Sequence, residues 1–464
     1  MTIRRVFAIL LLVSISAWAQ SGGLGSMRDP RTADQQSSVV GAIQPWLAVN
    51  GIYDTTLEQP DSSVGTVRRG LSLSGGLSMV KSFQRTDLVF GYAGSGSDYM
   101  GSAAGLDQGW MSSNVVTFAV SSQLTHRLTM DVSEVGGAAN GGFGAGAAGL
   151  QSGGLGVLGS LDVAGGYLSG SVAGLDAASG GLDVLSNNLV DAEYYQQMTY
   201  FSSTSANAGF LLSNRTMLNI SGTGAFIRRD ARTYSNVDVV GANAMLSTQL
   251  SRRFSVILGY SFDKIDFIQS IRNTYVQGGF AGIRYRFSPH DDLSLSVSDS
   301  YMDMQFVSTV TLPPDVAALL GVYTTSVVQN NSRSYVGGKF SYIHMFQRGG
   351  FNFVCNSMIA PGNDLILMAR TEGCTASLSR VLTSRFTVNA IPGVRLITGL
   401  TQAGSRYDVM NGGIVFGYRL VRGLSLTAGA GYRATEVHPS VNSVTGVTAN
   451  GGLRWSPRDE TNLF

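Results

Sequence analysis

The sequence predicts an all-β fold, a single antiparallel transmembrane β-barrel of about 18 strands. Apolar residues recur at every second position in segments of about ten residues, and short turns separate the segments. One such segment alternates with small or polar residues at Phe254, Val256, Leu258, Tyr260 and Phe262. Period two gives a strand one face for lipid and one face for a wet lumen.

The first 19 residues have the features of a secretory signal peptide. Two arginines precede an apolar run over 6–15, and an Ala-Trp-Ala site ends at Ala19. The run is shorter than the roughly 20 residues that a membrane-spanning helix needs, which disfavours an uncleaved anchor. We therefore expect Sec-type export to the periplasm, with cleavage between Ala19 and Gln20.

The composition agrees with a chain that has one face in lipid. Only 13% of the residues are charged, against about 25% in soluble domains, and 59 of 464 are glycine. The formal charge of +2 includes two arginines of the leader, so the exported chain is about neutral. A neutral chain without a basic cluster has no footprint for nucleic acid, and none is expected as a partner.

After a short periplasmic segment at 20–45, residues 46–464 read as one barrel. The predicted strands are 46–54, 70–82, 87–99, 114–124, 127–136, 194–213, 216–228, 238–250, 253–264, 274–287, 292–304, 333–346, 350–360, 365–382, 385–398, 406–420, 424–435 and 446–455. An even number of strands puts both termini on the periplasmic side. Sixteen strands is the nearest alternative, and twenty follows if the glycine-rich segment adds a hairpin.

The connections are short on one side of the predicted barrel and long on the other. The long ones are 100–113, 137–193, 305–332 and 436–445, an asymmetry typical of outer-membrane barrels. Prolines fall in turns and loops except Pro392, which predicts a bulge or an early end of its strand.

The long segment 137–193 is rich in glycine and carries too many apolar residues for wholly disordered chain. It either adds hairpins above the membrane, which we favour, or folds inward and narrows the pore.

The signal peptide, the strand pattern and the terminal Phe464 together resemble Gram-negative outer-membrane β-barrel proteins of the porin-like class. The resemblance covers architecture rather than one family. It implies a place in the outer membrane, contact with its lipid, and recognition of Phe464 by the barrel insertion machinery. The chain departs from the pattern because residues 456–460 separate the last strand from its end, so either Trp455 closes that strand or the tail re-enters.

Six arginines fall on the polar-facing parity of their strands: Arg284, Arg286, Arg395, Arg419, Arg433 and Arg454. The last four come from consecutive strands, so they form a basic wall that would favour anions in a wet pore. The alternative is that these arginines bind lipid phosphate or pair with acids near the periplasmic turns. Asp131, Asp299 and Lys339 are weaker candidates for the lumen, and Asp299 has the outward parity.

The two cysteines, Cys355 and Cys374, fall in one predicted hairpin on its apolar face. A disulfide is permitted in the periplasm, and two free thiols are equally compatible with the pattern. Two cysteines without a nearby histidine make no metal site, and we expect neither a metal nor another cofactor.

The histidines do not suggest an enzyme. His126, His290 and His438 fall in turns or loops and His344 near a strand end, and none faces a serine and an acid. The leading function is a porin-like passive channel for small polar solutes, among which the basic wall favours anions. The first alternative is a barrel for envelope assembly or for exopolysaccharide or lipid export. The second is a structural or adhesive surface protein.

Overall fold

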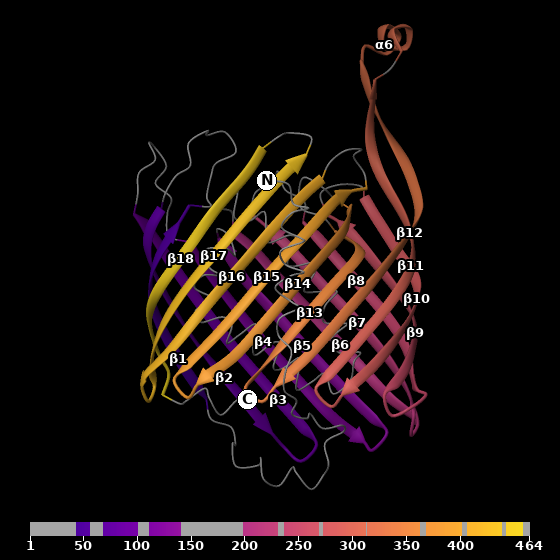
Figure 1. Ribbon diagram of the computed structural model, residues 1–464. Coiled ribbons are helices and arrows are strands. Elements are labelled where there is room, and N and C mark those ends of the chain that lie inside the picture. Colours follow the sequence, from indigo (N-terminus) through magenta and orange to yellow (C-terminus); the bar gives the residue numbers. More distant parts are fainter. Residues whose placement is uncertain are drawn as a thin grey trace.

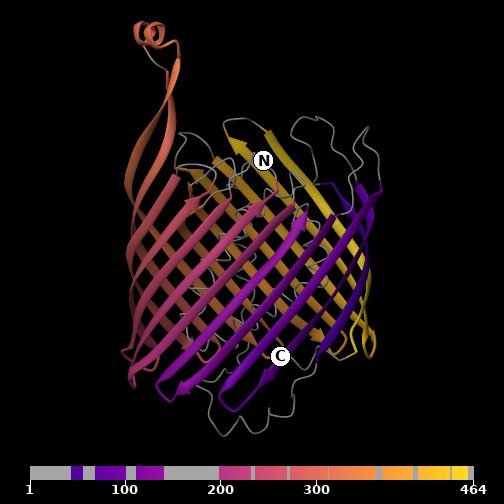
Figure 2. The same ribbon diagram turned by 180° about the vertical axis from the view of Figure 1, so that it is seen from behind.

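A computed structural model of the chain contains one antiparallel sheet of eighteen strands that closes on itself (Figures 1 and 2). The structure describes residues 43–55, 68–100, 111–140, 198–230, 236–268, 272–311, 313–361, 368–400, 406–438 and 442–457. The leader with Ala19 and Gln20, the terminal Phe464 and residues 141–193 of the glycine-rich segment lie outside these ranges.

The strands follow one another around the wall in chain order. Their bounds are β1 (Gln44–Asp54), β2 (Arg68–Ser82), β3 (Thr86–Met100), β4 (Met111–Thr125), β5 (Leu128–Asn140), β6 (Met198–Ser213), β7 (Thr216–Arg229), β8 (Val237–Gln249), β9 (Phe254–Phe267), β10 (Arg272–Ser288), β11 (Asp291–Thr311), β12 (Thr324–Phe346), β13 (Gly349–Pro361), β14 (Met368–Thr383), β15 (Phe386–Gly399), β16 (Arg406–Val421), β17 (Leu424–His438) and β18 (Asn442–Trp455).

The barrel closes where the first strand meets the last. β1 pairs with β18 from Leu47 opposite Trp455 to Asp54 opposite Thr448, and its other edge pairs with β2. Each remaining strand pairs with both of its neighbours. The predicted fold class and the count of eighteen strands are confirmed, and sixteen and twenty are wrong.

The two faces of the wall differ as the alternation predicts. On β1, Leu47 and Val49 are 46% and 48% exposed, whereas the intervening Ala48 is 1% exposed. On β9, Leu258 and Tyr260 are half exposed and Ile257 is buried. The exposed positions form the outer, lipid-facing side, and the others face the lumen. Below, a residue is called outward or inward according to which of the two alternating sets it belongs to, followed from strand to strand through the opposed residue pairs.

The prediction that 305–332 forms a long loop is wrong. Most of it is strand, because β11 and β12 stay paired up to Thr311 opposite Thr324. Their hairpin rises above the rest of the wall and ends in the short helix α6 (Pro314–Leu320) (Figure 1). No helix in the described ranges has the length and apolar character to cross a bilayer.

Pro392 neither bulges nor ends its strand. β15 runs through it to Gly399, and the register of β14 with β15 is the same on both sides of it. Around the proline, the ladder with β14 lacks the pairs at Ile391 and Pro392. The strand tolerates the proline with this local loss of pairing, because a proline removes a single N–H donor from the sheet.

The inward face is not polar throughout, which corrects the expectation of a uniformly small or polar lumen. From β4 to β11, buried apolar side chains line the half of the wall away from the short turns: Val115, Val135, Phe201, Ala225, Ile227, Val237, Val239, Ile265, Phe267, Val276, Met302 and Met304. All are at most 8% exposed, so little of their surface is open to solvent. We call this set the inner apolar band.

Candidate functional site

All six predicted arginines lie at inward positions. Arg454 is opposite the buried Ala48, and its guanidinium lies 5.1 Å from the ring centroid of Trp46. The paired positions around the ladder place the other five on the same face. Arg284, Arg286, Arg419 and Arg454 lie near the short turns, whereas Arg395 and Arg433 lie about midway along their strands.

A row of polar positions crosses the inward face at this middle level. It runs through directly opposed residues of four successive strands: Lys339, Asn356, Gly373 and Arg395. On the next two strands Asn411 is opposite Arg433. Three cations and two amides therefore line one side of the lumen between β12 and β17. We call these five side chains the basic row.

The lumen wall has an uneven charge. Within the described ranges, no inward position of β12–β18 carries an aspartate or glutamate. The inward acids lie on β1–β11, at Asp54, Asp87, Asp131, Asp263 and Asp292. One side of the wall is thus basic and the other carries the acids.

Two of the six arginines share one carboxylate that sequence reasoning missed. The Nε of Arg284 donates to both oxygens of Asp292, at 2.7 and 2.8 Å, and its Nη2 donates at 2.6 Å. The Nε of Arg286 lies 3.7 Å from the same carboxylate. The sequence alternative of pairing with acids near the turns thus applies to these two. The signal was available, because Asp292 shares the inward parity and lies directly opposite Arg286.

Replacing Asp292 with asparagine is expected to lower the free energy of unfolding by about 2 kcal/mol, because a charge-assisted bidentate contact of a part-buried arginine is lost. Urea unfolding of the reconstituted chain measures this. The matched control is Asp299→Asn on the same strand, whose side chain faces outward. Equal losses in the two variants would contradict the assigned pairing.

The remaining acidic and basic candidates divide between the two faces. Asp131 faces inward and accepts hydrogen bonds from Ser121 at 2.6 Å and from Asn207 at 3.2 Å. Lys339 faces inward within the basic row. Asp299 faces outward opposite Val336, as its parity predicts. Arg419 also faces inward and donates to the carbonyl of Ser384.

His344 is held in a structural contact near a short turn. His344 contacts Asp291 at 2.5 Å through Nδ1, and the same carboxylate accepts from Tyr342 and from Ser288. These three groups contact both oxygens of the Asp291 carboxylate, which lies on the outward face near a short turn. His290 is buried in that turn, and His126 lies in the turn between β4 and β5.

One group of possible metal ligands occurs on the outward face, where the sequence had suggested none. Ligand atoms of Asp408, Glu436 and His438 all lie within 4.8 Å of one another. Arg406, however, already binds both oxygens of Asp408, at 2.6 and 2.9 Å. The group is therefore an ion-pair network, and we assign no metal to it.

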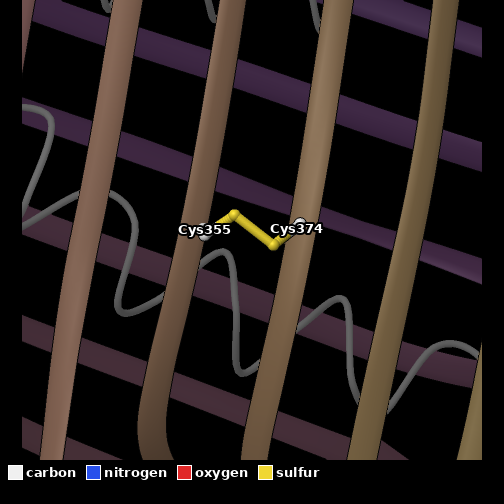
Figure 3. Close-up of a disulfide and its surroundings, with 2 residues drawn as sticks. All are labelled: Cys355 and Cys374. Atoms are coloured by element: carbon white, nitrogen blue, oxygen red, sulfur yellow. A yellow bond between two sulfur atoms is a disulfide. The ribbon is translucent and has the colours of Figure 1, made fainter. Parts of the chain in front are cut away.

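A disulfide joins Cys355 and Cys374, which lie directly opposite each other on the outward face of β13 and β14 (Figure 3). Of the two states that the sequence left open, the structure contains the bonded one. The bond closes a loop with a sequence separation of 19 residues.

Replacing both cysteines with alanine is expected to lower the free energy of unfolding by about 3 kcal/mol, the loop-closure entropy of a crosslink of this span. Urea unfolding in detergent, with and without reductant, measures the effect. Reductant should lower the stability of the wild type and leave the double variant unchanged. A wild type that does not respond to full reduction would contradict the expected contribution.

No protein-family model matches the chain, and no curated protein is significantly similar to it in sequence. Solved structures that resemble the chain include an iron transporter and two receptors. The FrpB iron transporter from Neisseria meningitidis is 9% identical, with a TM-score of 0.38 over 86% of this chain and 64% of that chain. The siderophore receptor PirA from Acinetobacter baumannii is 8% identical, with a TM-score of 0.39 over 90% and 81%.

The ferric yersiniabactin uptake receptor FyuA from Yersinia pestis is 8% identical, with a TM-score of 0.38 over 88% of this chain and 65% of that chain. This chain thus spans less than two thirds of FrpB and FyuA. At these identities and scores the likeness carries no argument about cargo. The closed antiparallel wall with its apolar outer face is itself the architecture of Gram-negative outer-membrane β-barrels, and the chain is an outer-membrane protein of this kind.

Proposed function

We propose that the chain is a passive channel that carries small anionic solutes across the outer membrane. The observation that carries this proposal is the uneven charge of the lumen wall. Inward cations lie on β12–β18, where the described residues include no inward acid. Charges of one sign on a low-dielectric wall attract counter-ions and raise their local concentration.

The basic row supports the choice of anion. Arg395 and Arg433 each offer a planar guanidinium, which matches carboxylate and phosphate oxygens. Asn356 and Asn411 add neutral donors at the same level. A solute that moves along this side would replace hydrogen bonds from water with hydrogen bonds from these side chains at about the middle of the wall.

The inner apolar band restricts the route. It covers the inward face of β4–β11 in the half away from the short turns, where a hydrated solute gains nothing from the wall. Buried apolar side chains also occupy inward positions of β14–β16 in this half, at Ala369, Ile397 and Tyr407, so the polar route follows β12–β18 at the level of the basic row and towards the short turns. This arrangement fits small solutes that travel along one side rather than through the full width of the barrel.

Planar-bilayer recording of the purified full chain tests the proposal. In a potassium chloride gradient we expect steady ohmic conductance and a zero-current potential of the sign given by chloride preference. Raising the ionic strength should weaken the preference, because salt screens the wall charges. Cation preference, or a folded chain that conducts nothing, would contradict the channel.

A surface role is the second candidate, and the β11–β12 hairpin favours it. Leu319 is 86% exposed and Tyr323 is 77% exposed at the tip of this hairpin. Exposed apolar side chains on a projecting element are typical of contact sites. A folded chain that is silent in bilayers would shift the weight to this role. An enzymatic role has no support from the described histidine contacts.

A further inference from the structure

The backbone pairing between β12 and β13 is shorter than the pairing on either side of these strands. These strands pair from Phe346 opposite Gly349 up to Gly338 opposite Ser357, and the described ladder between them ends there. On either side the pairing continues higher, to Thr311 opposite Thr324 and to Pro361 opposite Met368. We call the interval formed by 335–337 of β12 and 358–360 of β13 the β12–β13 seam.

Apolar side chains from both flanks of the seam meet in one cluster. Met302 of β11 and Met368 of β14, both 0% exposed, belong to one apolar cluster with Met304. Tyr335 of β12 and Ile359 of β13 pack against this cluster from the two sides of the seam. Methionine is flexible and re-packs around different shapes, so this closure can adapt to a guest.

Two buried hydroxyls near the methionines have no hydrogen-bond partner among the described residues. They are the Oη of Tyr335 and the Oγ1 of Thr274, and Thr274 lies opposite Met304 in the ladder. A buried hydroxyl without a partner is unfavourable and requires an explanation. A polar group that enters the seam would supply the missing acceptor.

A cation lies close in sequence to one of these hydroxyls, on the same strand. Arg333 is two positions from Tyr335 on the same inward face of β12, opposite Met302, and its side chain is exposed. The seam therefore places an apolar, adaptable cluster next to an orphaned donor and a positive charge. On the outward face Val336 is 66% exposed, with Asp299 opposite it and Arg370 opposite Ile359, so the outer surface of the seam is partly apolar and partly charged.

From this juxtaposition we propose that the β12–β13 seam binds a single-chain amphiphile with an anionic head. The tail lies among Met302, Met304 and Met368, and the head accepts a hydrogen bond from Tyr335 and faces Arg333. The inner apolar band continues from this cluster around β4–β11, so a tail bound at the seam has apolar wall beside it on the lumen side. The site shares the inward face of β12 with the proposed channel but lies farther from the short turns than the basic row, because Arg333 and Tyr335 precede Lys339 on that strand.

Binding of oleate to the full chain in nanodiscs of neutral lipid tests the site, with native mass spectrometry as the readout. We expect saturable binding of one oleate per barrel. Oleyl alcohol, which has the same tail without the charge, should bind more weakly, and acetate should not bind. Tyr335→Phe removes only the hydroxyl and should weaken oleate binding about tenfold, the effect of one charge-assisted hydrogen bond.

A crosslink across the seam supplies the second arm. The pair Val336→Cys and Ile359→Cys, oxidised and checked by mass, should abolish oleate binding because it holds the strands together. The matched control, Asp303→Cys with Ser332→Cys, joins opposed outward residues of β11 and β12 and should bind as the wild type does.

Unsaturable partition of oleate into the bilayer, or equal binding by the crosslinked and control chains, would overturn the proposal. If Tyr335→Phe binds oleate as tightly as the wild type, Tyr335 is not the donor to the head group, and that part of the proposal is overturned. Conductance of the crosslinked chain should equal that of the wild type. A failure of the channel proposal therefore leaves this test intact.

Discussion

Replacing Gly452 with valine is expected to prevent stable closure of the barrel and to lower the free energy of unfolding by about 3 kcal/mol. A Cβ at this inward position would collide with the carbonyl oxygen of Val49 and lie 2.7 Å from the Cα of Asn50. Both are backbone atoms of β1, so relief requires β1 to move away from β18. A flexible side chain could yield at little cost, but these atoms cannot.

The location makes the effect large. β1 and β18 are the two ends of the sheet, and eight opposed residue pairs hold them together. Losing this contact exposes two strand edges at once, and neither lipid nor a neighbouring strand satisfies their backbone groups. The folded fraction, read from the heat-dependent shift on a detergent gel and from urea unfolding, measures the loss.

Gly451→Val is the matched control for this experiment. Gly451 is the adjacent, outward residue, and a Cβ there would lie 3.8 Å from the carbonyl oxygen of Thr427, an ordinary contact. It should fold as the wild type does, since valine suits a lipid-facing strand. Similar folded fractions for the two variants would refute the close approach of β1 to β18.

The second large effect concerns ion selectivity. The double variant Arg395→Glu, Arg433→Glu is expected to convert the proposed anion preference into cation preference. The two substitutions change the wall charge by about four units at the level of the basic row, and the potential of a narrow route follows its nearest charges. The zero-current potential in a salt gradient measures the change.

The control for selectivity changes the same number of charges elsewhere. Arg252 and Arg253 are exposed in the turn between β8 and β9, and reversing both leaves the inward face of the wall unchanged. This control should retain anion preference. If both double variants shift the potential equally, net charge rather than the basic row sets the selectivity.

The wall was predictable because its pattern is local. Alternation along a single strand identifies its lipid-facing side, as Leu258 and Tyr260 do on β9. Every strand needs an apolar outer side because every strand meets lipid. The inward placement of Arg395, Arg433 and Lys339 follows from the same parity. Strand ends were less secure, because β11 and β12 extend by pairing with each other above the membrane level.

Features that depend on register between strands were not predictable. The basic row exists because Lys339, Asn356 and Arg395 fall on one line across β12–β15, and no single segment specifies that alignment. The inner apolar band was missed for a related reason. Residues such as Ile227 and Ile265 extend strands whose inward positions lower down are polar, so the change of character appears only when the strands are aligned.

The most direct test of the account measures which face of β9 meets lipid. Spin labels at successive positions from Leu258 to Asp263, in chain reconstituted into bilayers, report contact with oxygen, which concentrates in hydrocarbon, and with a polar nickel complex. We predict high oxygen contact at positions 258, 260 and 262 and low oxygen contact at 259, 261 and 263. Uniform contact along the strand, or the opposite phase, would contradict the barrel wall and the lumen charges derived from it.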